Sequence, residues 1–243
     1  MQKATRQQTR THNSQLILKT IYDRGQVSRA EIARLTHLTR TTVSGVVAEL
    51  MEEGLVAEIG VGPSAGGKPP ILLSVVDDAR HLVAVDLANS EFRGALINLR
   101  GEFPHRLNLP VADRNGDAAL ELVYTLIDEL LAMAERPVLG IGIGSPGLMD
   151  ARQGVVRIAV NLEWRDLPLG DLLEARYGLP VYIANDSQVA ALAEMRFGSS
   201  KDADNLVVVR VGRGVGSGIV LNRQLHYGDN FGAGEIGHVV LDP

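Results

Sequence analysis

The stretch from Pro180 to Gly198, PVYIANDSQVAALAEMRFG, constrains the fold most strongly, because its periodicity changes abruptly at a carboxylate. Val181–Ile183 is typical of a short buried strand. Apolar residues then recur at helical spacing, at Val189, Ala190, Ala193 and Phe197. Asn185 and Asp186 are therefore expected where a strand passes into a helix, at the sheet edge where open α/β folds bind polar ligands. A plain helix N-cap at Asp186 is the alternative.

Composition is that of an ordinary globular chain of 243 residues, which is long enough for two domains. There are no cysteines, so a disulfide framework is excluded. No apolar run approaches the ~18 residues of a membrane span, and no signal peptide is recognisable. We therefore expect a soluble cytoplasmic protein without a membrane partner.

Charge is distributed unevenly along the chain, whose net charge is −5. The first 50 residues contain eight Lys or Arg and three acidic residues, a net charge of +5, so the remaining residues carry −10. A basic N-terminal segment on an acidic body indicates that only this segment meets a polyanion such as nucleic acid.

The basic segment has the pattern of three short helices. An apolar stripe over residues 13–21 ends before Gly25, and Ser28 with Glu31 forms a capping-box pattern that opens a second helix. Thr39 caps a third helix, in which apolar residues recur on one inward face. Its outer face is small and hydroxylic, which is typical of a helix-turn-helix that enters the major groove. A three-helix bundle with a neutral surface is the alternative. The outer face comprises Arg40, Thr41, Ser44, Gly45 and Ala48.

Two expected strands, Leu55–Ile59 and Pro70–Val75, enclose the glycine-rich loop GVGPSAGGKPP. This pattern predicts a winged hairpin. Lys68 near the end of the loop is placed to reach a phosphate or the minor groove, although a plain flexible hairpin is the alternative. The predicted domains are residues 1–75, which bind DNA, and residues 79–243.

The acidic body alternates expected strands and helices, as in an α/β fold. Strands are expected at 81–87, 92–99, 102–109, 138–144 and 205–211, and helices at 115–135 and 169–177. The loop Ser145-Pro-Gly147 follows one buried strand, and the glycine-rich run of residues 212–218 follows another. Alternating glycines are typical of phosphate cradles, but they also occur in tight hairpins.

Several of these motifs resemble the ROK family of repressors, open reading frames and kinases. The run VSRAEIARLTHLTRTTVSGVVAELMEEGLV with its GGKPP wing is similar to the winged helix-turn-helix of the ROK repressors, among them xylose-type and N-acetylglucosamine-type regulators. GIGSPG, IANDSQVAALAE and GEIGH resemble motifs of the ROK effector domain. The resemblance implies an actin-like, ribonuclease H-like domain of the sugar-kinase type, incomplete at its C-terminus. It also implies DNA contacts by Arg40, Thr41, Thr42, Ser44 and Lys68.

In the effector domain the resemblance implies sugar binding by Asn185, Asp186, Glu235 and His238. In the kinases the aspartate at the place of Asp186 is the general base, whereas a repressor can keep the carboxylate for sensing alone. The family's histidine at the place of His238 also ligates zinc with a cysteine cluster. Because this chain has no cysteine, we expect no stable metal site and no cofactor. Zinc would require a cysteine-containing C-terminal region, which favours a fragment or a truncated product.

The first phosphate loop departs from the family pattern. In the kinases the turn at Asp86 resembles Asp-x-Gly-x-Thr, whereas Ala88, Asn89 and Ser90 stand here. Each added Cβ crowds a backbone that would approach phosphate. The second loop, with Gly214 and Gly216, is intact. Both loops must close on one nucleotide, so we interpret both as vestigial.

These observations predict a transcriptional regulator, by hypothesis a repressor, of carbohydrate-utilisation genes. It would bind double-stranded operator DNA as a homodimer or higher oligomer and respond to a monosaccharide. We expect no enzymatic activity. Two alternatives stay open: an ATP-dependent ROK sugar kinase with Asp186 as base, and a DNA-binding protein whose body only dimerises.

Overall fold

The computed structural model describes residues 5–63, 66, 68–88, 90–212 and 214–240. They form two compact units. The first contains the chain up to Arg80 together with the short segment Asn98–Gly101, and the second contains His81–Ile97 and the chain from Glu102 onward. The segment 98–101 therefore belongs to the first unit, although the strands on either side of it belong to the second.

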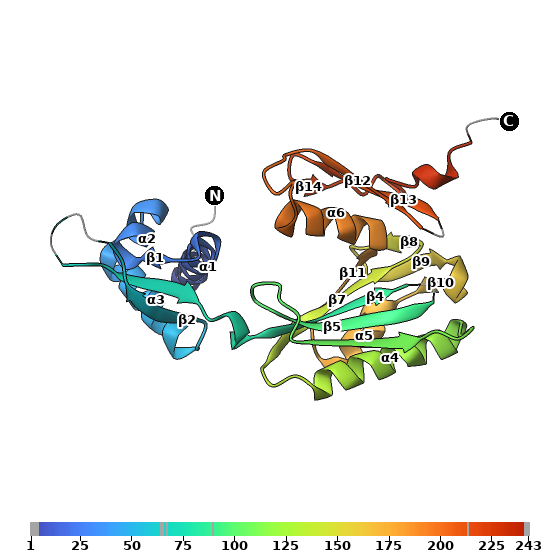
Figure 1. Cartoon of the computed structure of the whole chain (residues 1–243), viewed down its shortest axis with the longest axis horizontal. Helices are drawn as coiled ribbons and strands as arrows, with labels where there is room; N and C mark the ends of the chain where they lie inside the picture. The colour runs from blue at the N-terminus through green and yellow to red at the C-terminus, as the bar shows by residue number, and fades with distance from the viewer. Residues whose placement is uncertain (1–4, 64–65, 67, 89, 213, 241–243) are drawn as a thin grey trace. The chain divides into compact units, whose positions relative to one another are not determined.

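The first unit consists of three helices and a small antiparallel sheet in the order β1-β3-β2 (Figure 1). Its core is formed by apolar residues that include Ile17, Ile32, Val43, Val47 and Leu73. Its elements are α1 (Arg6–Arg24), β1 (Val27–Ser28), α2 (Arg29–Thr36), α3 (Arg40–Glu52), β2 (Val56–Val61), β3 (Ile71–Val75) and the 3-10 turn η1 (Asp77–Ala79).

Local caps define where α1 and α2 begin, and α1 begins earlier than expected. Helix α1 begins at Arg6 because Thr5 and Gln8 form a reciprocal capping box. At the start of α2 the Ser28 hydroxyl accepts a hydrogen bond from the Glu31 amide at 3.2 Å, as expected. The Glu31 carboxylate lies 3.5 Å from Arg34 in the next helical turn.

The second unit is built on a five-stranded sheet in the order β11-β7-β4-β5-β6. Strands β4, β7 and β11 are parallel, and β5 pairs with β6 in the antiparallel sense. The strands are β4 (His81–Leu87), β5 (Glu91–Asn98), β6 (His105–Pro110), β7 (Val138–Ser145) and β11 (Val181–Asn185). Because three strands run in parallel, their carboxyl ends meet at one edge, which is where ligands bind in such sheets.

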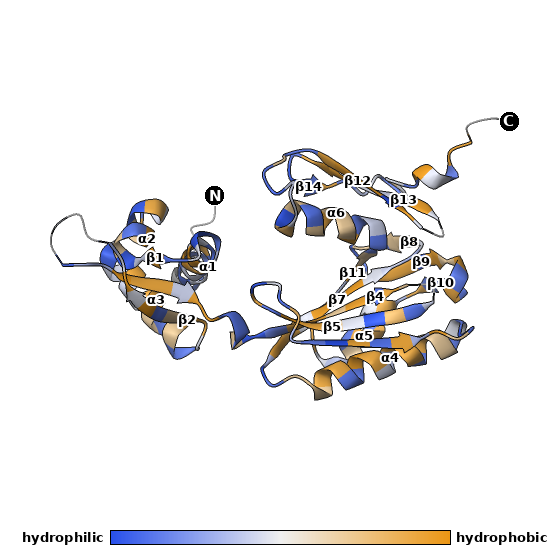
Figure 2. Cartoon of the chain, in the orientation of Figure 1, coloured by the Kyte–Doolittle hydropathy of each residue, from blue (hydrophilic) through white to orange (hydrophobic). Residues whose placement is uncertain are grey.

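Helices lie on both sides of this sheet, but the side opposite α4 is only partly covered, and Tyr182 on β11 is 73% exposed. Figure 1 shows α4 (Gly116–Ala132) along one face and α6 (Asp186–Phe197) on the other. Helix α4 contributes a continuous apolar side to the core, visible in Figure 2, with Val123, Leu126, Ile127 and Leu130 fully buried. The remaining elements are β8 (Leu148–Asp150), β9 (Val155–Ala159), η2 (Val160–Leu162), β10 (Trp164–Leu167), α5 (Leu169–Tyr177), β12 (Leu206–Val211), β13 (Val215–Leu221), β14 (Gln224–Leu225) and η3 (Ile236–His238).

The helix after β11 forms as predicted, but the predicted buried face is wrong. Val189 is 38% exposed and Phe197 is 66% exposed, whereas Ser187, Gln188 and Ala191 are buried. Small side chains at 187 and 191 lie one turn apart, and the backbone of β13 packs against them. Close backbone approach, rather than an apolar stripe, therefore decides which side of α6 faces the protein.

None of the described helices is long and apolar enough to cross a membrane.

Candidate functional site

The turn between α2 and α3 presents the predicted recognition helix. His37 has a left-handed backbone (φ 57°) at the end of α2, and the Thr39 side chain caps α3 by accepting from the Thr42 amide at 3.1 Å. Val43, Val46, Val47 and Leu50 fix one side of α3 in the core. The opposite side is consequently turned outward.

Three of the predicted DNA contacts lie on that outward side. Arg40, Thr41 and Ser44 are exposed. Gly45 is exposed as well, and a Cβ at this position would meet no atom within 4 Å. Packing within the unit therefore does not require glycine at 45, although glycine costs about 1 kcal/mol in a helix interior. Close approach of an external partner would account for it.

Thr42, the fourth predicted contact on α3, lies differently. It is half-buried, and its hydroxyl is 2.9 Å from the Thr39 hydroxyl. Its polar group is thus engaged in the cap. A role for Thr42 in DNA binding stays a prediction, as it does for the other residues.

The predicted wing is the antiparallel pair β2–β3, with a β-bulge between Glu58 and Gly60. Its loop is closed by a hydrogen bond from the Gly62 amide to the Pro70 carbonyl at 2.8 Å. Lys68 is exposed on this loop, while residues 64, 65 and 67 lie outside the described residues. An exposed lysine at a hairpin tip is suitably placed for a phosphate contact.

In the second unit, the predicted strand-to-helix junction lies at the carboxyl edge of the parallel strands. Asn185 pairs in register with Ser145, and Asp86 pairs with Gly144, so the ends of β4, β7 and β11 are adjacent. The helix N-cap is Asn185, so the alternative that Asp186 is the cap is wrong. The Asn185 side-chain oxygen accepts from the amides of Ser187 and Gln188 at 2.9 and 3.3 Å.

Asn185 also holds the Ser-Pro-Gly loop. Its amide nitrogen donates to the Gly147 carbonyl at 2.9 Å. Gly147 has φ 93°, and a Cβ there would lie 2.1 Å from the Ile158 carbonyl oxygen, so only glycine fits. The cap and the loop contact thus use most of the hydrogen-bonding groups of the Asn185 side-chain amide, and the residue organises the edge of the sheet. The predicted sugar contact would have to use the second N–H of this amide.

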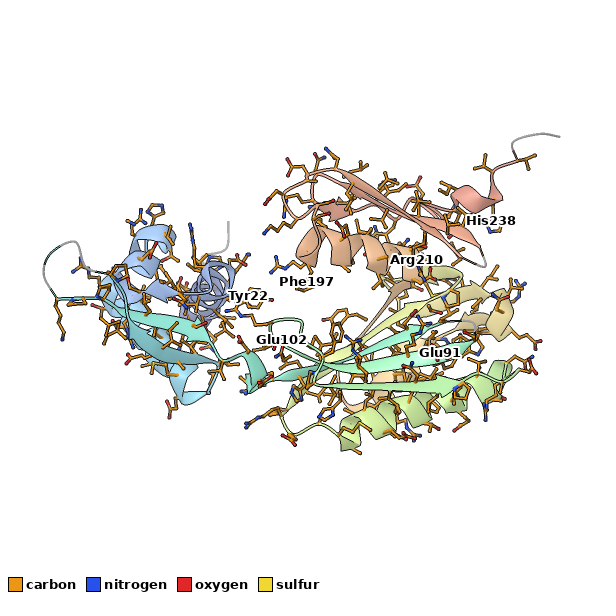
Figure 3. All side chains as sticks on the ribbon, viewed as in Figure 1. Tyr22, Glu91, Glu102, Phe197, Arg210 and His238 are labelled. Carbon is orange, nitrogen blue, oxygen red and sulfur yellow. The ribbon has the colours of Figure 1, made fainter. Side chains whose placement is uncertain are left out.

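Asp186 is the first residue of α6, and both of its carboxylate oxygens have a donor. Arg210 Nη1 lies 2.7 Å from Oδ2, and the Ser187 hydroxyl donates to Oδ1 at 3.2 Å. Figure 3 shows Arg210 near the start of α6. The carboxylate side chain retains 27% exposure, so it stays accessible to a ligand.

Asp86 lies near the same cluster. Burial raises its pKa above the ordinary value, the guanidinium groups of Arg210 and Arg93 oppose this, and the Asp186 carboxylate adds to it. Arg93 Nη1 is 3.9 Å from Asp86 Oδ2. Two carboxylates and two guanidinium groups thus alternate at the edge. In the turn that follows, Ala88 is half-buried and Ser90 is exposed, while Asn89 lies outside the described residues.

The glycine-rich run packs against α6. A Cβ on Gly216 would lie 2.6 Å from the Ser187 hydroxyl oxygen, and one on Gly218 would lie 2.4 Å from the Ser187 carbonyl oxygen. Contact with the helix backbone therefore explains Gly218 without a ligand. The contact at Gly216 is with a side-chain hydroxyl, and Gly214 has open space around its Cβ position. The assignment of Gly214, Gly216 and Asp86 to vestigial phosphate loops stays a prediction.

Glu235 and His238 lie on the last described turn. The Ser217 amide and hydroxyl both donate to the Gly234 carbonyl, which fixes this turn to β13. His238 Nε2 is 3.7 Å from Glu235 Oε2, and the histidine side chain is 85% exposed. Among the described residues, the contacts connect Asn185, Asp186 and Arg210 but do not connect Glu235 or His238 to them.

Residues 82–243 match the ROK family, and residues 15–63 match the MarR family. The chain belongs to the ROK family. It is 36% identical to the xylose repressor of Caldicellulosiruptor bescii over 95% of this chain and 59% of that protein. It is also 36% identical to a glucokinase of Halalkalibacterium halodurans, over 68% of this chain and 51% of that protein.

Among solved structures, a ROK family transcriptional regulator described as a homologue of the E. coli MLC protein matches 97% of this chain and 60% of its own chain. The TM-score is 0.81 and the sequence identity is 29%. The ROK chain described here thus spans about 60% of the length of these repressor-type relatives.

Sequence reasoning did not identify Arg210 or Arg93 as part of the site. A signal was present for Arg210, which is the one charged residue in the apolar strand LVVVRV. A charge in such a strand points to a partner across the fold, but the sequence alone does not identify that partner.

Proposed function

We propose that this ROK protein is a DNA-binding transcriptional repressor of carbohydrate-utilisation genes and that a monosaccharide regulates it. The exposed face of α3 carries the proposal: Arg40, Thr41 and Ser44 point outward from a helix whose other side is fixed in a core. The similarity to the C. bescii xylose repressor over 95% of this chain supports the same conclusion.

DNA recognition would follow the helix-turn-helix mode. Helix α3 enters the major groove, with Arg40 near its N-terminal end and Lys68 on the phosphate backbone beside it. A homodimer would place two such helices on half-sites about 34–36 Å apart, or a multiple of that distance.

Sugar recognition would occur at the carboxyl edge of the parallel sheet. Asp186 accepts hydrogen bonds from ligand hydroxyls, and Asn185 positions the loop and the helix that frame it. Glu235 and His238 are proposed as further hydroxyl contacts. Sugar would favour one conformation of the protein and operator DNA another, with a coupling of about 1–3 kcal/mol.

Zinc does not fit the described residues. A structural zinc takes four ligands, and no group of three or more His, Cys, Asp or Glu side chains gathers among the described residues. Within the described part of the chain, Glu235 is the one acidic residue at ion-pair distance from His238. No metal is therefore included in the proposed mechanism.

The glycine-rich run does not by itself indicate a nucleotide phosphate. The Cβ positions of Gly216 and Gly218 face the first turns of α6, so the run packs against the protein's own helix. The Asp186 carboxylate, which a kinase would use as general base, is engaged by a guanidinium. We therefore propose sensing without phosphoryl transfer.

The test combines DNA and sugar binding. Fluorescence anisotropy at moderate salt should show that the protein binds DNA from upstream of its own gene more tightly than it binds a scrambled duplex. D-xylose, D-glucose or N-acetyl-D-glucosamine should then change that affinity. Equal binding to both duplexes would refute the repressor function.

Two further outcomes separate the alternatives. The intact Asp186 favours a sugar kinase as the second candidate, and ATP turnover with any of these sugars at about 1 s⁻¹ or faster would establish it. Specific DNA binding with no sugar binding by calorimetry would instead indicate a body that only dimerises.

A further inference from the structure

The side chains of β12 point alternately to the two sides of the strand, with exposed valines on one side and Arg210 on the other. Val207, Val209 and Val211 are 58%, 51% and 79% exposed, so they lie on the side of the strand that faces away from the protein. Arg210 alternates with them and reaches the first residue of α6. A single charged residue of this strand is thus directed at Asp186.

Glycines of β13 permit this approach. Arg210 pairs in register with Gly216 on β13, and Gly218 follows on the same side of the strand. A Cβ on Gly218 would lie 2.4 Å from the Ser187 carbonyl oxygen, so a larger residue there would force the β12–β13 pair away from α6. Glycine at 218 therefore keeps β12 close enough to α6 for the Arg210 guanidinium to reach Asp186.

The two donors fix the orientation of the Asp186 carboxylate. Arg210 occupies one acceptor position on Oδ2 at 2.7 Å, and Ser187 occupies one on Oδ1 at 3.2 Å. An ionised carboxylate has about four acceptor positions in total, so the described residues leave one on each oxygen for a ligand. These two positions lie on the two oxygens of one planar group.

We propose that Arg210 is a positioning residue for the effector: with Ser187 it holds Asp186 so that one free acceptor position on each oxygen receives a vicinal diol of an uncharged monosaccharide. This inference rests on the proposed sugar-binding function and specifies the chemistry of the same site. Two hydroxyls on neighbouring carbons match two acceptor oxygens on one carbon. The Arg210 guanidinium neutralises the Asp186 carboxylate, whose charge an uncharged ligand does not compensate.

Charge near the site favours an uncharged ligand over a phosphorylated one. The three carboxylates of Asp86, Asp186 and Glu91 outnumber the two guanidinium groups of Arg93 and Arg210, so the cluster has a net charge of −1 when all are ionised. Each guanidinium lies within 4 Å of a carboxylate. A phosphate would have to displace a carboxylate from its cation. A diol needs only the vacant acceptor positions.

The experiment uses the 243-residue chain and calorimetry with D-xylose, D-glucose and their deoxy analogues that lack one of two adjacent hydroxyls. The parent protein should bind at least one parent sugar, and each deoxy analogue in the recognised pair should bind roughly 10- to 100-fold more weakly. Arg210→Gln should weaken binding of the parent sugar by roughly 10- to 100-fold and abolish discrimination against the deoxy analogue.

Arg210→Lys should recover most of the affinity, because the contact to Asp186 uses a single donor. Ser187→Ala should show a smaller loss than Arg210→Gln, since it removes a neutral donor at a longer distance. Arg165→Gln, at an exposed arginine on β10, is the matched control and should bind like the parent protein. Thermal unfolding confirms that each variant is folded.

One contrary result is that the parent protein binds sugar and Arg210→Gln binds it with the same affinity and the same discrimination against the deoxy analogue. That result would overturn the role of Arg210 and leave the proposed function intact. Absence of sugar binding in the parent protein would overturn both. Binding of ATP or a sugar phosphate that is lost in Arg210→Gln would assign Arg210 to a phosphate anion and also overturn the inference.

Discussion

Arg100 is the residue whose removal should most clearly loosen the first unit. Its guanidinium donates from Nε to Asp77 Oδ1 at 2.9 Å and from Nη1 to the Tyr22 carbonyl at 2.9 Å. It also lies 3.4 Å from the Ser74 hydroxyl and stacks on the Tyr22 ring, 4.9 Å from its centroid. One side chain from the 98–101 segment thus joins α1, β3 and η1.

The cost of Arg100→Ala follows from these contacts. The Tyr22 carbonyl is in the last turn of α1, where helix carbonyls accept hydrogen bonds from outside the helix, so the charged donor there contributes about 1.5 kcal/mol. The half-exposed pair with Asp77 adds about 0.5 kcal/mol and the stacking on Tyr22 about 0.5 kcal/mol. We expect a loss of about 2.5 kcal/mol, or a lowering of the midpoint by roughly 10–20 °C for a unit of this size.

The assay separates the two units. Trp164 is the only tryptophan and is buried in the second unit, so its fluorescence reports unfolding of that unit alone. Hydrogen exchange of peptides from α1 and α3 reports the first. Arg100→Ala should accelerate exchange in α1 and α3 and leave the tryptophan transition unchanged. Arg100→Lys should lose roughly half as much stability, because lysine keeps the positive charge but not the several N–H donors of the planar guanidinium. Unchanged exchange in α1, or an equal shift in the tryptophan transition, would refute the reasoning.

Four further predictions concern the two candidate sites. Arg40→Ala should weaken operator binding by about 1–3 kcal/mol in anisotropy titrations if the arginine contacts a base edge, and unchanged affinity would remove it from the interface. Lys68→Ala should weaken specific and scrambled DNA alike and reduce the slope of log K against log salt by about 1. Gly218→Ala should destabilise the second unit by about 2–3 kcal/mol, because its Cβ would lie 2.4 Å from a carbonyl oxygen of α6, while Gly214→Ala, with open space, should be nearly neutral in the same tryptophan-monitored urea titration. The raised pKa of Asp86 means that the folded state binds this proton more tightly than the unfolded chain does, so its ionisation costs stability as pH rises through the folded pKa. Asp86→Asn should therefore stabilise the second unit at pH 7 and change it little at pH 3, and equal effects at both pH values would contradict this cause.

The sequence was most informative where one face of an element is buried. In α3, Val43, Val46, Val47 and Leu50 recur at helical spacing, and all four are buried. The same argument failed for α6, where Val189 and Phe197 are exposed. There the contact is made through backbone and small side chains, which leave no hydropathic pattern. Periodicity records burial of large side chains and is insensitive to glycine packing.

The candidate site shows the same limit. Asp186 was found because it stands at a change of period, which is a local property of the sequence. Its partner Arg210 is 24 positions away along the chain, and only the pairing of β12 with β13 and their packing on α6 bring the two charges to 2.7 Å. Long-range charge pairs depend on register, which the sequence does not specify by itself.

The glycine-rich run illustrates why a motif needs its structural context. From the sequence, Gly216 and the glycines around it resemble a phosphate loop, and an intact loop would favour a kinase. In the fold, Gly218 is required because a Cβ there would lie 2.4 Å from the Ser187 carbonyl oxygen, and Gly216 lies against the Ser187 hydroxyl. That packing would be needed whether or not a nucleotide binds, so these two glycines do not distinguish a kinase from a sensor. The same close approach brings Arg210 onto Asp186, so the feature that resembles a phosphate cradle also places a cation on the carboxylate that phosphoryl transfer would require as a free base.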